Sequence, residues 1–100
     1  MKAASNRTLL IAKRRKAFLS SLSLVSVTLR DIRDARGISQ ETLAKWSGVG
    51  AKTISTYETG ARTARMSIEN LGFICCALGI TIAEFFDEVR KRILAMEVQE

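Results

Sequence analysis

The sequence contains no histidine and no proline, and its only two cysteines, Cys75 and Cys76, are adjacent. Two neighbouring cysteines without histidine exclude a zinc site of the usual kind. Neighbours on a helix point about 100° apart, so these two would not readily form a disulfide. We therefore interpret them as reduced thiols packed as small hydrophobes, and we predict a cytoplasmic protein with no metal and no cofactor.

Long apolar runs are also absent, and none of the stretches is long enough to cross a membrane. Residues 13–29, KRRKAFLSSLSLVSVTL, faintly resemble a signal peptide but lack an Ala-x-Ala-like cleavage site. A catalytic site would need groups that this sequence does not offer: a histidine, a reactive cysteine or a phosphate-cradling loop. We predict a protein that has no membrane partner and is not an enzyme.

The charge of the chain is strongly uneven along its length. Residues 1–36 hold nine basic and two acidic side chains (+7), and residues 37–66 hold four and two (+2). Residues 67–100 hold three basic and six acidic side chains (−3), which gives a net charge of +6. A basic front and an acidic back favour a polyanion as the partner of the front part.

Apolar residues recur at helical spacing throughout, and six glycines supply most of the punctuation. One hundred residues suffice for one small core, so we predict an all-α domain. Expected helices cover residues 27–36, 39–47, 50–59, 67–78 and 81–96. Ser39 and Ser67 are expected N-caps, Thr81 and Glu84 have the spacing of a capping box, and Gly48 ends the second helix.

Residues 40–59, QETLAKWSGVGAKTISTYET, have the spacing of two helices joined by a tight turn. Ala44 is small where the two backbones cross, and Gly48 tolerates the positive φ of the turn. Apolar residues that would face a shared core follow at the expected positions: Leu43, Val49, Ile54 and Tyr57.

The segment LRDIRDARGISQETLAKWSGVGAKTISTYETG, followed by LGFICCALGITIAEFF, resembles the Cro/cI-type, Xre-like helix-turn-helix family of phage and bacterial regulators. The resemblance covers residues 29 to about 86 and implies a compact five-helix, lambda-repressor-like DNA-binding domain. It gives residues 1–22 as a basic N-terminal extension, 23–88 as the DNA-binding domain and 89–100 as a C-terminal helix extension. Gly50 departs from the family, which usually has a Ser or Thr N-cap there.

In this family the second helix of the motif lies in the major groove with its N-terminal end toward the bases. Carried over by position, the expected base contacts are Ala51, Lys52, Thr53, Ser55 and Thr56. The expected phosphate contacts are Gln40, Gly50, Thr59, Arg62 and Arg65. The resemblance also implies a structural salt bridge between Arg33 and Glu58. Trp46, at a position the family usually keeps polar, is expected to pack within the chain, with contact to a partner as the alternative.

Two segments lie outside this resemblance. Lys13 to Lys16 form either a solvated charge run, a phosphate-contacting arm or a membrane-surface contact, and residues 1–22 either extend the first helix or break at their serines. At the other end, Ile82, Phe86, Val89, Ile93 and Met96 form an apolar stripe with 4-3-4-3 spacing. From Val89 onward this stripe either contacts a second copy or packs within the chain, which leaves Val89, Ile93 and Met96 as candidate dimer contacts.

We therefore expect a sequence-specific transcriptional regulator, acting as a repressor that binds a pseudo-palindromic operator as a homodimer. Two recognition helices about 34 Å apart would read successive major grooves of double-stranded DNA. The alternative is an antitoxin that binds a protein toxin and autoregulates its operon.

Overall fold

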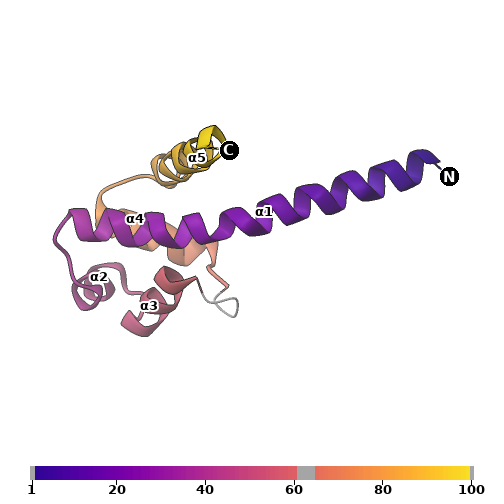
Figure 1. Ribbon diagram of the computed structural model, residues 1–100. Coiled ribbons are helices and arrows are strands. Elements are labelled where there is room, and N and C mark those ends of the chain that lie inside the picture. The colour runs from indigo at the N-terminus through magenta and orange to yellow at the C-terminus, as the bar shows by residue number, and fades with distance from the viewer. Residues whose placement is uncertain (1, 61–64, 100) are drawn as a thin grey trace.

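The computed structural model describes residues 2–60 and 65–99, which form five helices (Figure 1). They are α1 (Lys2–Ala35), α2 (Gln40–Ser47), α3 (Ala51–Thr59), α4 (Ile68–Leu78) and α5 (Ile82–Gln99). Helices α3 and α5 pack on opposite sides of the C-terminal half of α1, α2 packs on α3 and α4, and α4 also contacts α5 (Figure 1). The all-α class and the five-helix architecture are thus confirmed.

The helix ends follow the local chemistry that the sequence predicts. Ser39 Oγ accepts a hydrogen bond from the backbone N–H of Thr42, and Ser67 Oγ accepts one from that of Asn70, each at 3.0 Å. Thr81 and Glu84 form the expected capping box, with reciprocal bonds of 2.9 and 3.0 Å. These side chains satisfy helix N–H groups that have no partner within the helix.

All five helices contribute to a single core. Its buried apolar side chains are Leu29, Leu43, Val49, Ile54, Tyr57, Leu71, Ile74, Cys75, Leu78, Phe85 and Val89. Burial raises the pKa of the Cys75 thiol to about 11, which keeps it protonated and unreactive. Cys76, its neighbour, lies about 100° further round the helix and is exposed.

The N-terminal serines do not break α1. Ser20 Oγ donates to the carbonyl of Lys16, and Ser21 Oγ donates to that of Phe18. Such bonds to carbonyls three or four residues back satisfy the hydroxyls inside a continuous helix. Residues 6–22, which we call the arm, project away from the other four helices (Figure 1), and the molecule reaches 54 Å in its longest dimension.

Two expectations about packing are wrong. Trp46 lies on the outer face of α2 with 59% of its surface exposed, so it does not pack within the chain. Val89 is buried in the core of its own chain, so it is not available as a dimer contact. Phe85 is fully buried in the core, whereas its neighbour Phe86 is 41% exposed.

Within the described residues, no single helix is both long and apolar enough to span a membrane. Helices α4 and α5 together would meet the length and composition, but a bend of 95° separates them.

Candidate nucleic-acid interface

The turn between α2 and α3 is closed by Gly48. Its φ of +77° lies in the left-handed region that favours glycine, and its N–H donates to the carbonyl of Ala44 at 2.9 Å. The next residue, Val49, is buried and its N–H donates to Ser47 Oγ at 3.1 Å. The turn therefore fixes the angle at which α3 leaves α2.

Helix α3 is held against the domain by its inner face. Ile54 is fully buried and Tyr57 is nearly so, and Asn70 Nδ2 of α4 donates to the Tyr57 hydroxyl at 3.0 Å. Because Ile54, Tyr57 and the buried Glu58 occupy one side, the opposite side of α3 is left to face outward.

The residues expected to contact bases lie on this outer side. Lys52 is exposed, while the other four, Ala51, Thr53, Ser55 and Thr56, are partly exposed. Thr56 Oγ1 donates to the carbonyl of Lys52 at 2.8 Å, so its hydroxyl proton is engaged and its lone pairs remain free to accept. Lys52 is the strongest donor in this set, whereas Thr56 suits a donor such as the amino group of cytosine or adenine.

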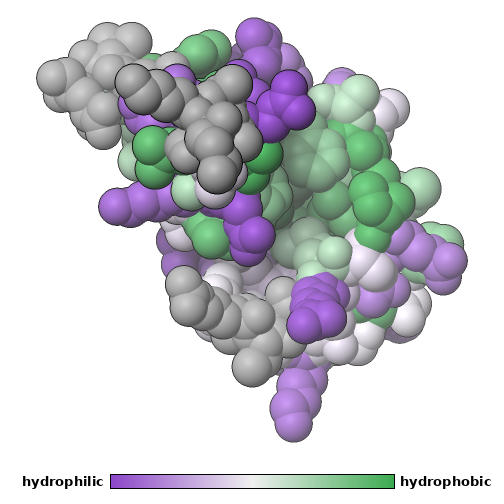
Figure 2. Space-filling model, turned by 90° about the vertical axis from the view of Figure 1, so that its right-hand side faces the viewer, coloured by the Kyte–Doolittle hydropathy of each residue, from purple (hydrophilic) through white to green (hydrophobic). Residues whose placement is uncertain are grey.

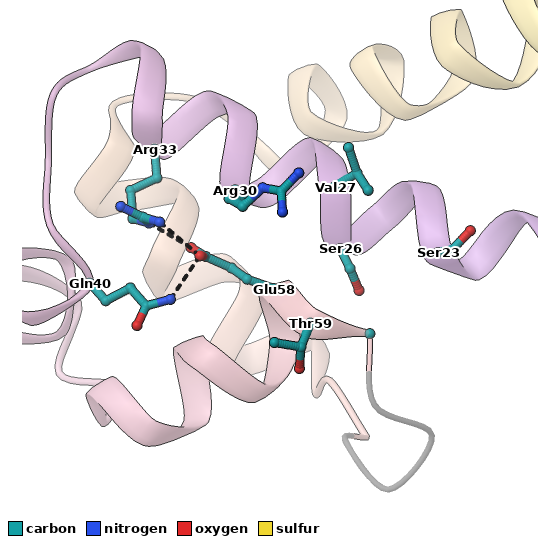
Figure 3. Close-up of a pocket in the computed structure, with 9 residues that line it drawn as sticks. Ser23, Ser26, Val27, Arg30, Arg33, Gln40, Glu58 and Thr59 are labelled. Carbon is teal, nitrogen blue, oxygen red and sulfur yellow. Dashed lines mark hydrogen bonds and ion pairs between the residues drawn. The ribbon is translucent and has the colours of Figure 1, made fainter.

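A buried polar cluster ties the end of α3 to α1 and α2 (Figure 3). Arg33 Nε donates to Glu58 Oε2 at 2.6 Å, and Arg33 Nη2 donates to Glu58 Oε1 at 2.9 Å. Gln40 Nε2 donates to Glu58 Oε1 at 2.9 Å, and Arg33 Nη1 donates to the carbonyl of Ile38 at 2.7 Å. The Glu58 carboxylate therefore accepts three bonds while being 5% exposed.

This cluster is electrostatically well matched. The hydrogen bonding that Arg33 donates to Glu58, helped by the negative charge of the carboxylate, raises the pKa of Arg33 above its usual range. A bidentate Arg–carboxylate pair fixes orientation as well as distance. The structure thus brings together Arg33 and Glu58, which the family resemblance pairs, and adds Gln40, whose bond to Glu58 was not expected.

That bond changes what Gln40 can offer a phosphate. One of the two N–H groups of its side-chain amide is engaged inside the protein, so the donors left for a phosphate at this position are the other amide N–H and the backbone N–H in the first turn of α2. Thr59 is exposed, although its Oγ1 donates to the carbonyl of Thr56. Arg65 is exposed, and Arg62 lies outside the described residues.

Beside the cluster, a cleft of about 430 Å³ separates α1 from the end of α3 (Figure 3). Arg30 lines it with about half of its side chain exposed, and Ser26 lies opposite Gly60. A Cβ on Gly60 would stand 3.2 Å from Ser26 Oγ, and the φ of this glycine is +70°. The sequence did not lead us to expect Arg30 beside this site, although it lies in the arginine-rich segment LRDIRDAR.

The part of the chain that the structure describes contains no candidate metal site. No group of three or more histidine, cysteine, aspartate or glutamate side chains there could hold a metal ion. Of the remaining candidate dimer contacts, Ile93 is half-buried and Met96 is half-exposed.

Known proteins share this fold and this arrangement of α2 and α3. Residues 29–85 match the family model described as helix-turn-helix. The clp gene regulator ClgR from Corynebacterium glutamicum has a similar structure, with 26% identity over 79% of this chain and 82% of that one (TM-score 0.69). The search of curated proteins found no match.

The wild-type restriction-modification controller protein C.Esp1396I is 33% identical over 75% of this chain and 95% of its own (TM-score 0.67). The tetramer of that protein in complex with its natural 35 base-pair operator is similar too, with 34% identity over 74% and 95% (TM-score 0.67). Fold and site together define a DNA-binding transcriptional regulator. The chain belongs to the helix-turn-helix family, in its Cro/cI-type, Xre-like branch.

Proposed function

We propose that the protein is a repressor that binds a pseudo-palindromic operator as a homodimer and acts without catalysis, in the cytoplasm. The observation that carries this proposal is the outer side of α3, a row of small and mostly polar side chains, partly exposed, around the exposed Lys52. Such a row, held rigidly from behind by Ile54, Tyr57 and Glu58, fits the major groove of double-stranded DNA.

In this proposal the base contacts come from Ala51, Lys52, Thr53, Ser55 and Thr56. Phosphate contacts come from the start of α2 at Gln40, from Gly50 and Thr59, and from Arg62 and Arg65 after α3. Residues 23–88 are the DNA-binding unit, 1–22 a basic extension and 89–100 a C-terminal helix extension that offers dimer contacts beyond the buried Val89, although α1 runs without interruption across the first of these boundaries.

One recognition helix gives too little interface for tight specific binding, so we infer two copies on one operator. The relation to C.Esp1396I, which binds its operator as a tetramer, supports assembly on DNA. The alternative, an antitoxin that neutralises a protein toxin, is not favoured, because the similar structures are a gene regulator and a restriction-modification controller.

The test is selection of bound sequences from random double-stranded DNA with the purified full chain. We expect an inverted repeat whose half-sites are about 10 base pairs, or 34 Å, apart. Recovery of sequences without any common motif would refute specific recognition, and recovery of a single unrepeated half-site would refute the dimer.

A further inference from the structure

The arm leaves large apolar side chains in water. Ile11, Phe18 and Leu22 are 51%, 63% and 42% exposed, respectively. They continue, at 7-4-3-4 spacing, the same face of α1 that Val25 and Leu29 place in the core. A helix face that is apolar both inside and outside the domain indicates a partner for its outer part.

The charge of the arm limits what this partner can be. Residues 6–22 contain five basic side chains, Arg7 and Lys13 to Lys16, and no acidic one. No ion pair engages any of these five within the described chain. Two arms packed on each other would bring ten positive charges together, so arm-to-arm pairing is disfavoured.

The C-terminal third of the same chain has the complementary properties. Residues 67–89 hold four acidic and no basic side chains, although α5 as a whole has a net charge of −1 because Arg90, Lys91 and Arg92 follow. Their helices also expose apolar side chains: Phe86 (41%), Leu94 (46%) and Met96 (50%) on α5, with Phe73 (48%) on α4. Figure 2, which looks at the molecule from the side of the arm, shows hydrophobic surface gathered on one side of a hollow, with hydrophilic side chains on the other.

The arrangement in space brings these two surfaces to one side of the molecule. Figure 1 shows α5 running toward the side from which the arm projects. A two-fold axis on that side would therefore carry each arm across the α5 of the other copy. We propose that the arm of each copy packs along α5 of a second copy, so that two reciprocal contacts clasp the dimer. This inference rests on the proposed dimer and names its interface.

The size of the contact suits a stable dimer. The arm spans about 26 Å at 1.5 Å per residue, and α5 spans about 27 Å. Covering the exposed parts of Ile11, Phe18 and Leu22 would remove on the order of 300 Å² from water per arm. With an equal area on α5 and the two-fold repeat, this comes to about 1,200 Å², the lower end of the usual range of about 1,200–2,000 Å².

The first test asks which side chains meet between copies. An equimolar mixture of ¹⁵N-labelled and unlabelled full chains, without DNA, is treated with a zero-length amine-to-carboxyl cross-linker. We expect mixed-label cross-links from Lys13 and Lys16 to carboxylates of α5, such as Glu84, Asp87 and Glu88. Cross-links from these lysines that are all of one label, or no such cross-links, would overturn the proposal.

The second test measures the dissociation constant of the dimer by sedimentation. The variant Ile11→Gln/Phe18→Gln/Leu22→Gln is expected to dimerise at least tenfold more weakly than the wild type. A matched variant, Ala12→Gln/Ala17→Gln/Ser20→Gln, adds three glutamines to other faces of the same arm and should stay within threefold. Both should melt close to the wild type, because these six positions are exposed.

Equal dissociation constants for the two variants would overturn the clasp. The clasp would also be overturned if neither variant changed the dissociation constant of the dimer while Lys13→Ala/Lys16→Ala lowered the salt dependence of DNA affinity. The arm would then be a DNA contact. Cross-linking and sedimentation use no DNA, so a failed clasp leaves the reading of DNA by α3 to be judged by sequence selection alone.

Discussion

Replacing the Glu58 carboxylate by an amide, Glu58→Gln, should strongly destabilise the domain. The carboxylate is 5% exposed and accepts two bonds from Arg33 and one from Gln40. An amide keeps the size of the side chain but removes the charge, and it turns one acceptor into a donor that faces other donors. The Arg33 guanidinium, with its side chain 11% exposed, would then keep only the exposed Asp34, 3.3 Å from its Nη1, as a counterion.

Breaking a buried pair by removing one partner costs roughly 3–5 kcal/mol. For a domain of this size each kcal/mol corresponds to a shift of about 4–8 °C in the midpoint, so a loss of at least about 12 °C is expected. Thermal and urea unfolding followed by circular dichroism measure this directly. The matched control is Glu41→Gln on the exposed first turn of α2, which should change stability by less than about 0.5 kcal/mol.

A double-mutant cycle separates the pair from its surroundings. Arg33→Met and Glu58→Met should each be costly alone, while the double variant should be less destabilised than the sum of the two. If Glu58→Gln melted within 2 °C of the wild type, or the two methionine effects were additive, the cluster would not hold α3 in place and the reasoning would be wrong.

Three further predictions concern single positions. Lys52→Ala should weaken binding to the selected operator by about 1–3 kcal/mol while leaving binding to unrelated DNA within threefold; equal losses on both would make Lys52 a phosphate contact. Gly60→Ala should cost about 1–3 kcal/mol, more than Gly48→Ala, because only the first adds a 3.2 Å contact to a strained positive φ, and equal urea midpoints would contradict this. A thiol reagent at pH 8 should label Cys76 and spare Cys75, whose pKa is raised to about 11 by burial; equal labelling of the folded chain would contradict that burial.

The parts of the fold that sequence predicts well are those set by neighbours in the chain. Ser39, Ser67 and the Thr81–Glu84 pair act within one turn, so their roles follow from spacing alone. The long-range pair of Arg33 and Glu58 came from a family resemblance, since nothing local indicates which of ten acidic side chains meets which arginine.

The apolar residues of α5 show that helical spacing alone does not decide which side of a helix is buried. Phe85 and Phe86 are adjacent and equally apolar, so a stripe drawn through Phe86 and Val89 is as regular as one drawn through Phe85. Only the angle at which α5 meets the other helices selects Phe85 and Val89 for the core. For the same reason, the sequence did not show that α2 turns Trp46 to solvent.

Gly50 remains the departure from the family that the chain itself does not explain. Its φ of −59° is open to any residue, and a Cβ there would meet only Thr53 Oγ1 at 3.8 Å. Neither backbone conformation nor packing within the described chain therefore requires glycine, and the position supplies no side-chain cap. On the proposed interface, however, a side chain at the N-cap would stand between the first N–H groups of α3 and a DNA phosphate. Glycine gives that phosphate its closest approach to the positive end of the helix, in exchange for the few tenths of a kcal/mol that a capping hydroxyl would add.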